Sequence, residues 1–370
     1  MHWRSLARPQ LNAQLSDAQQ TQEAEIVIFR YDRVESVRTH RDPFDDLCCW
    51  ISGLRSVRYS RELLNAVHKF PSRTTLEPAA AVSAHADAAI QLLEQGQSAA
   101  AEVAFLPLYY ALLNLAKIYV IVGGRLSDLQ EQRWHGATHS GARKASHDLM
   151  TDTVSLKGRG AIPLLYTVLT GEKVPRANLT LKMSEIYRYI WDVSYEYERL
   201  YGHVLAFERV EVDFEDDPST KGRRMVAKLP ETGRPTAPKK DLRLLSHFKP
   251  DASRPNTYVS PGVSGNVVGS QVLLLSQLRR SLLVCDSDMW GQMHTFTPVS
   301  NRLFLWPEEI PILLAFFHMS NVVRYNPEFL AKLKDSRAWG LLLVLRNHGV
   351  LKFLKLFWER VSNSCFCLQT

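Results

Sequence analysis

Residues able to bind an anion recur at helical spacing in an apolar segment near the C-terminus. His318, Asn321 and Arg324 follow one another every three residues within the expected helix 310–325, so they mark one stripe of its surface. An imidazole, an amide and a guanidinium on one stripe can hold phosphate oxygens through charge-assisted hydrogen bonds. The spacing therefore predicts a polar face suited to anion binding.

A second polar stripe is expected on the apolar segment 101–122. At about 100° per residue, Glu102, Asn114 and Lys117 fall within one arc of about 120°, and the rest of the circumference is apolar. If the two helices face each other in one bundle, they form a cationic groove that suits phosphate or a nucleic-acid backbone. The candidate anion-binding residues, three of them from the segment that would close over the groove, are Lys117, His135, Arg143, Lys157, His318, Asn321 and Arg324.

The same polar groups also have a purely structural interpretation, which we favour at this stage. Buried polar side chains usually satisfy one another, and a carboxylate such as Glu102 could neutralise the cations and fix the register of the helices. The sequence leaves both interpretations open.

The histidines of segment 135–147 raise the question of a metal site. Residues four apart share a helix face, so His135 and His139 could both reach one ion. However, Gly136 and Gly141 argue against a rigid helix there, and Asp148 is the one nearby carboxylate. We expect loop histidines without a metal, and no cofactor.

The five cysteines form neither a disulfide nor a zinc pattern. Cys48 and Cys49 are adjacent, Cys285 stands alone, and Cys365 and Cys367 are separated by one residue. An odd number without Cys-x-x-Cys spacing predicts free thiols in a reducing compartment. The first twenty residues contain no apolar stretch typical of a secretion signal, so we expect a cytoplasmic protein.

Segment 101–122 is also the best candidate for a membrane span. Its longest run without a strongly polar residue, 103–113, is well short of the roughly 20 residues that cross a bilayer. We therefore predict a buried core helix and no membrane partner. The formal charge of +7 permits an acidic partner, including nucleic acid, although the basic residues are dispersed along the chain.

The elements that must position these residues are mainly helical. The alanine-rich segment 79–97 has high helix propensity, and Gly123-Gly124 ends the helix that follows it. Period-two alternation predicts a β-hairpin in which 204–214 pairs with 225–229, and 230–265 has the composition of a linker. A strand is also expected at 25–31.

The expected fold is therefore mainly α, a helical bundle with a small β-containing insertion. Four segments follow from the changes in composition: an N-terminal segment of short helices and turns at 1–75, the first part of the helical core at 76–203, the β-hairpin and linker insertion at 204–300, and the second part of the core at 301–370.

Three segments together resemble the YaaC-like family of bacterial proteins. They are LYYALLNLAKIYV at 108–120, the segment 135–166 with its His-Gly, Arg-Lys and acidic-x-Val elements, and LLAFFHMSNVVRYNPEFL at 313–330. The first of them also resembles the core helix of the wider HEPN superfamily. The resemblance implies a helical fold in a family without an established biochemical role. If the HEPN resemblance holds, the relatives are of two kinds. Some are metal-independent ribonucleases of toxin and antiviral systems, and others bind a partner without catalysis.

The HEPN ribonuclease signature places an arginine before a polar residue, with a histidine four to six residues after the arginine. The arginine stabilises the phosphate in the transition state and the histidine transfers a proton. Arg346 begins such a signature, but His348 follows too soon. Arg133 and His139 have acceptable spacing, but Trp134 stands where a small polar residue is expected. The sequence therefore favours binding over catalysis.

We expect a non-catalytic helical module that binds an anionic partner such as nucleic acid, or another protein encoded nearby, with oligomerisation open. A role in stress or phage defence rests on the resemblance alone. The alternative is a HEPN-type metal-independent endoribonuclease with a degenerate site.

Overall fold

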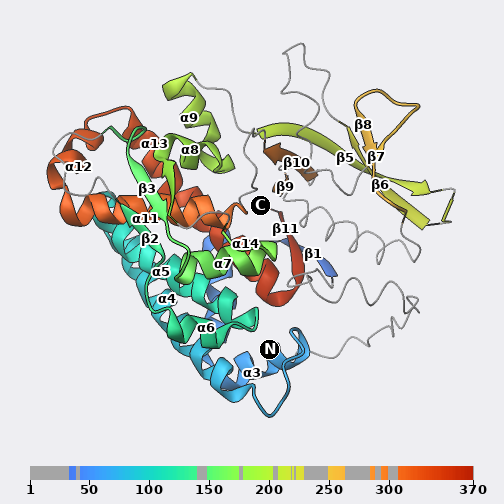
Figure 1. Cartoon of the computed structure of the whole chain (residues 1–370), viewed down its shortest axis with the longest axis horizontal. Coiled ribbons are helices and arrows are strands. Elements are labelled where there is room, and N and C mark those ends of the chain that lie inside the picture. Colours follow the sequence, from blue (N-terminus) through green and yellow to red (C-terminus); the bar gives the residue numbers. More distant parts are fainter. Residues whose placement is uncertain are drawn as a thin grey trace.

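The structure is a computed structural model of the whole chain, shown in Figure 1. The predicted strand at 25–31 and the candidate residue Arg143 lie outside the part of the chain that it describes. The described residues are 33–38, 42–139, 148–174, 178–202, 207–217, 219–220, 222–228, 249–262, 284–287, 293–298 and 307–369.

Two long helices run along the lower left side of the view in Figure 1. Helix α4 (Leu76–Ser98) and helix α5 (Ala101–Val122) lie side by side (Figure 1). Gly96 allows their close approach, because a Cβ atom at this position would lie 2.5 Å from the side chain of Leu108. As predicted, α5 ends at Gly123-Gly124, and Gly124 adopts a φ of +75° that glycine favours.

Helix α11 (Glu309–Tyr325) packs against α5. Through this contact, the helices before and after the β-rich region share one core. The ring centroids of Phe105 and Phe316 are 5.5 Å apart, as are those of Tyr109 and Phe317. Apolar residues from 47 to 197 and from 310 to 361 form one buried cluster. Two helical segments separated by the β-rich region therefore share a hydrophobic core.

The last helices complete this core. Helix α13 (Ala338–Val344) continues through a π-helical turn (Leu345–Gly349) into α14 (Val350–Ser362), so the helical winding changes near residue 348. The guanidinium of Arg360 lies 2.7 Å from the carboxylate of Glu309, and both side chains are buried. This ion pair ties α14 to the first turn of α11.

Short helices surround the long ones. Over residues 183–201, the structure has α8, a 3₁₀ turn and α9. The short elements are α2 (Pro43–Ser52), η1 (Gly53–Arg55), α3 (Val57–Ala66), α6 (Leu126–Glu131), α7 (Ala161–Thr170), α8 (Met183–Arg188), η2 (Trp191–Val193), α9 (Ser194–Tyr201) and α12 (Pro327–Lys334).

Among the described residues, three sheets accompany the helices. The sheet that bears on the candidate site is an antiparallel one of β2 (Ala137–His139), β3 (Thr153–Leu156) and β4 (Leu179–Lys182). A parallel pair joins the two ends of the chain, β1 (Arg33–Arg38) and β11 (Ser364–Gln369). The third is a six-stranded sheet in the order β7-β8-β6-β5-β10-β9, beside the helices in Figure 1.

The predicted hairpin is present in the six-stranded sheet as β5 (Phe207–Asp217) and β6 (Gly222–Lys228), which pair in antiparallel register. The turn is shorter than predicted, because both strands extend into the charged segment 215–224 that separates the two predicted strands. The linker prediction for 230–265 is wrong over 249–262, where β7 (Lys249–Pro250) and β8 (Thr257–Val259) pair with each other and β8 pairs with β6. The two remaining strands are β9 (Val284–Ser287) and β10 (Met293–Pro298).

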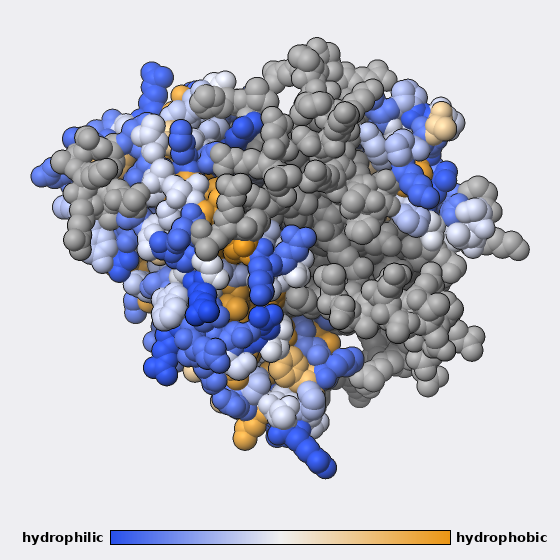
Figure 2. Space-filling view, viewed as in Figure 1, coloured by the Kyte–Doolittle hydropathy of each residue, from blue (hydrophilic) through white to orange (hydrophobic). Residues whose placement is uncertain are grey.

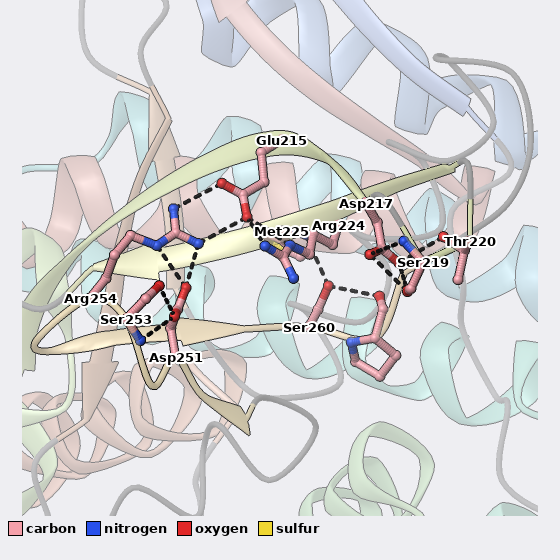
Figure 3. A network of polar contacts seen from close by, with 11 residues as sticks. Glu215, Asp217, Ser219, Thr220, Arg224, Met225, Asp251, Ser253, Arg254 and Ser260 are labelled. Carbon is pink, nitrogen blue, oxygen red and sulfur yellow. Dashed lines mark hydrogen bonds and ion pairs between the residues drawn. The ribbon is translucent and has the colours of Figure 1, made fainter.

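Polar contacts explain why the charged segment is ordered as strand (Figure 3). Arg254 donates to both oxygens of Glu215 at 2.8 and 2.9 Å, and Arg224 pairs with the same carboxylate. The Asp217 carboxylate accepts hydrogen bonds from Ser219 and Thr220 in the turn. The charged residues of this segment, whose composition is typical of a solvated loop, therefore form ion pairs with neighbouring segments of the sheet.

The fold class is confirmed as mainly α with small β parts. Helix α5 is long and apolar enough to cross a membrane, yet 72% of its most apolar 18-residue window is buried inside the protein, as in a core helix. Hydrophilic residues cover most of the described surface in Figure 2, with small hydrophobic areas between them. The four segment boundaries stay a prediction.

Candidate functional site

The polar stripe of α11 is divided between two different environments. His318 is fully buried and lies against Asp152, whereas Arg324, six residues later, reaches the partly exposed Tyr110 of α5. Asn321 belongs to the second environment, because its side-chain oxygen accepts a hydrogen bond from Arg324 at 3.3 Å. The three residues therefore lie along one helix, as predicted, but His318 contacts one group of side chains and Asn321 and Arg324 contact another.

Arg324 is held by α5 through an aromatic side chain. Its guanidinium donates to the hydroxyl of Tyr110 at 3.1 Å and lies 5.8 Å from the centroid of that ring. It also lies 5.0 Å from the ring of Tyr325. No described carboxylate pairs with Arg324, so its charge is balanced only by the faces of aromatic rings and by neutral oxygen atoms.

Lys117 lies one helical turn beyond Asn114 on the predicted stripe of α5. The amide of Asn114 donates to the Tyr110 carbonyl and its oxygen lies 2.8 Å from Nδ1 of His85 on α4. Lys117 itself is half-buried, and burial lowers the pKa of its ammonium group. Within the described part of the chain it forms no ion pair or hydrogen bond.

Glu102 does not neutralise this region. Its carboxylate pairs with Lys334 of α12, and not with Lys117 or Arg324. The structural interpretation required a carboxylate of this kind to balance the two cations. The described residues supply none.

His135 packs against the tyrosines of α5 at the start of the segment that leads into β2. Its Nδ1 is 2.8 Å from the hydroxyl of Tyr109, and its ring lies 5.9 Å from that of Tyr110. Burial lowers the pKa of His135, and the positive charges of Lys117 and Arg324 lower it further. Both cations are therefore close enough to act on one imidazole. We call Lys117, His135, Asn321 and Arg324, with Tyr110, the cationic cluster.

Two glycines with positive φ fix the position of His135. Gly136 has φ +86° and Gly160 has φ +119°, and a Cβ atom at Gly160 would lie 2.5 Å from the backbone of Gly136. Where these two glycines approach each other, the carbonyl of His135 accepts a hydrogen bond from the amide of Ile162 at 3.0 Å. The chain can turn into β2 here because neither glycine carries a side chain.

The remaining candidates are placed differently. The amide of Lys157 donates to the carbonyl of Gly136 at 2.8 Å, so its backbone lies beside His135, and its side chain is half-buried. No contact joins that side chain to the cationic cluster among the described residues. Arg143 lies outside the described residues, so its part in the site stays a prediction.

A second cluster lies deeper, where β2, β3 and α11 meet. Nε2 of His139 and Nε2 of His318 approach the same Asp152 oxygen, Oδ2, at 2.7 and 2.9 Å. The side chains of His139, Asp152 and His318 are 2%, 4% and 0% exposed. We call these three residues the buried triad.

Local pairing explains how the triad forms. His139 pairs with Val154 in the β2–β3 ladder, which places it beside the residue that precedes β3, Asp152. The other carboxylate oxygen of Asp152 accepts from the amide of Thr153 at 2.9 Å. Burial alone would raise the pKa of Asp152, but the hydrogen bonds and positive charge of the two histidines outweigh it and hold that pKa well below its ordinary value.

This arrangement replaces the one considered from sequence. His135 and His139 do not share a helix face, because His139 belongs to a strand and His135 bonds to Tyr109. The nearby carboxylate is Asp152 and not Asp148. The donor atoms of His139, Asp152 and His318 lie within 4.8 Å of one another, close enough to hold a metal ion.

Neither candidate ribonuclease signature brings an arginine to a histidine. Arg346 donates to three backbone carbonyls, those of residues 96 and 97 at the C-terminal end of α4 and of residue 99 in the turn that follows. Arg133 donates to the carbonyl of Gln130, and its partner in the signature, His139, is in the buried triad. Both arginines therefore have structural contacts in place of a phosphate site.

Comparison with known proteins identifies the family. A profile of the family described as YaaC-like Protein matches residues 53–345. The chain belongs to the YaaC-like family. The matched YaaC-like region includes every described residue of the cationic cluster and of the buried triad. No curated protein and no solved structure matches the chain.

The sequence did not predict the buried triad, although each of its three residues belongs to a segment discussed above. Asp152 is the acidic residue of the acidic-x-Val element, and His318 was assigned to the anion stripe. The signal that could have found the site is the strand pairing of segments 137–139 and 153–156, which brings a histidine and an aspartate together.

Proposed function

We propose that this YaaC-like protein is a non-catalytic helical module that binds the phosphate backbone of nucleic acid at the cationic cluster. The observation that carries the proposal is the half-buried Lys117, which has no carboxylate partner among the described residues and whose charge, like that of Arg324, acts on the imidazole of His135. A desolvated cation without a counterion is costly, and an anionic ligand would supply one. A HEPN-like bundle and a role in defence are finer expectations of the same proposal, and both derive from the resemblance.

The side chains around Lys117 suit a phosphate group. A guanidinium can donate to two phosphate oxygens, and an ammonium group adds a point charge. The ring of Tyr110, held at the Arg324 guanidinium, provides a surface on which a base can stack. These groups recognise phosphate and aromatic rings, and they carry no element that would read a particular base sequence.

Fluorescence anisotropy with a labelled single-stranded RNA of about 20 nucleotides, in buffer containing a chelator, tests the proposal. Lys117→Met and Arg324→Gln should each weaken binding about tenfold, since each removes one charged contact. Each variant should also reduce the slope of log K against log salt by about 0.7, the value expected for one phosphate contact on a single strand.

Lys334→Met is the matched control, because it removes the same charge from a lysine that Glu102 already neutralises. It should leave the affinity unchanged. An equal loss in this control, or no binding by the unaltered protein at low salt, would refute the cationic cluster as a nucleic-acid site.

The same reactions test the ribonuclease alternative on a gel. We expect the RNA to stay intact in chelator. Cleavage that disappears in His135→Ala and Arg143→Ala variants would replace the binding module with a metal-independent endoribonuclease.

A further inference from the structure

We propose that the buried triad of His139, Asp152 and His318 is a binding site for a divalent first-row transition-metal ion of the Zn²⁺ class. This proposal is independent of nucleic-acid binding, because the cationic cluster uses other side chains. It depends on three observations: the chemistry of the donors, their convergence from separate elements, and an unpartnered buried hydroxyl on helix α8, which packs against α11.

The donor set selects the class of ion. Two imidazoles and one carboxylate are ligands typical of Zn²⁺ and Fe²⁺ in proteins. Mg²⁺ and Ca²⁺ prefer sites built wholly from oxygen, which this cluster is not. The triad therefore fits a borderline ion that accepts nitrogen and oxygen together.

The donors converge from three parts of the fold. His139 ends β2, Asp152 precedes β3, and His318 lies in the middle of α11. The two imidazole rings meet edge to face with their centroids 4.7 Å apart. Both Nε2 atoms turn toward one oxygen, so three potential metal ligands already point at a common centre.

The distances require only a small adjustment. With bonds of about 2.0 to 2.2 Å, the donors of a tetrahedral Zn²⁺ site lie about 3.3 Å apart. The observed separations from Oδ2 are 2.7 Å to His139 and 2.9 Å to His318. Each imidazole would therefore move outward by about half an ångström, as its shared proton is replaced by the ion.

The carboxylate is held in place by its surroundings. The amide of Thr153 donates to Oδ1 of Asp152, which leaves Oδ2 to face the histidines. The backbone of Asp152 is bonded at both ends, to the carbonyl of Asp148 and to the amide of Met183. Outer hydrogen bonds of this kind orient metal ligands and raise their affinity.

Tyr187 of α8 supplies the third observation. Its side chain is fully buried, and its hydroxyl has no hydrogen-bond partner among the described residues. Burial raises the pKa of Tyr187, and the charges of Tyr201 and Asp152 raise it further, while α8 itself packs against α11. A water molecule on the fourth position of the ion would give this hydroxyl a partner.

The test uses the full chain, freed of metal by dialysis against a chelator and titrated with Co²⁺ or Zn²⁺. We expect one equivalent to bind, with the visible absorption of four- or five-coordinate Co²⁺ and a rise in melting temperature. X-ray absorption of the Zn²⁺-loaded protein should show two imidazoles and no sulfur ligand. This measurement needs no variant, so it holds even if a substitution prevents folding.

Variants then assign the site. His139→Gln and His318→Gln should each weaken Co²⁺ binding by about a hundredfold or more, whereas the exposed His348→Gln should leave it unchanged. Failure of the unaltered protein to bind one equivalent, sulfur ligation, or full binding by folded His318→Gln would overturn the proposal.

Discussion

The two clusters on helix α11 differ in how their charge is balanced. In the buried triad, the carboxylate of Asp152 faces two imidazoles and every side chain is almost fully enclosed. In the cationic cluster, Arg324 of α11 and Lys117 of α5 have no described carboxylate partner and remain partly accessible. Charge compensation within the fold is what a stabilising or metal-holding cluster needs. Uncompensated charge near the surface leaves compensation to a ligand.

The largest expected effect separates the clusters by stability. Asp152→Ala should lower the free energy of unfolding by about 3 to 5 kcal/mol, because it removes the common acceptor of two buried imidazoles. Urea unfolding in the presence of chelator measures the change without any contribution from a metal. Asp148→Ala, at an exposed position, is the control. A loss of unfolding free energy below about 1 kcal/mol in Asp152→Ala would contradict a stabilising role for the buried triad.

A change of the opposite sign is expected in the cationic cluster. Lys117→Met should raise the free energy of unfolding by up to about 1 kcal/mol, because it replaces a half-buried, uncompensated ammonium with an apolar chain of similar length. The same urea experiment without RNA measures it. A loss of stability in this variant would mean that Lys117 has a structural partner, and the two clusters would then be alike.

Acid should destabilise the cationic cluster and the neighbouring His85 of α4. Burial lowers the pKa of His85 despite its hydrogen bond with Asn114, and nearby Lys117 lowers it further; burial, Lys117 and Arg324 lower that of His135. A lowered folded pKa means that the unfolded chain binds the proton first. The associated stability is present above about pH 6.5 and is lost as pH falls toward the folded values.

Urea unfolding at pH 7.5, 6.5 and 5.5 measures this dependence. We expect the loss of stability below pH 6.5 to shrink when His85 and His135 are both replaced by Gln. An unchanged dependence in the double variant would show that other groups control the acid response.

The smallest expected effect is a change in one pKa. Binding of inorganic phosphate to the cationic cluster should raise the pKa of His135, because an anion offsets the positive charges that lower it. Histidine NMR titration with and without phosphate measures the shift. His348, an exposed histidine that belongs to neither cluster, serves as the internal reference, and equal shifts at both residues would argue against a specific site.

The sequence was a good guide to elements and a poorer guide to partners. Apolar periodicity predicted α5 and α11, and the glycine pair predicted the end of α5. It could not tell that His318 turns to Asp152 while Arg324 turns to Tyr110, since the first contact spans 166 residues and the second 214. Local patterns report which face a residue occupies, but long-range packing decides what that face meets.

The charged segment near residue 215 shows the same limit. Its composition predicts a solvated loop, but pairing of Glu215 with Arg224 and Arg254 makes strand favourable. The partner arginines lie 9 and 39 residues away along the chain. The tighter hairpin and the strands within the expected linker follow from pairing that composition cannot show.

The packing of α11 against α5 also has a consequence for synthesis of the chain on the ribosome. The contact between Tyr119 and Glu309 spans 190 residues, so α5 emerges long before the helix that covers it. At about 5 to 20 residues per second, the apolar surface of α5 waits roughly 10 to 40 s for its cover. During that interval the nascent protein depends on α4, on transient contacts or on chaperones to keep this surface from aggregating.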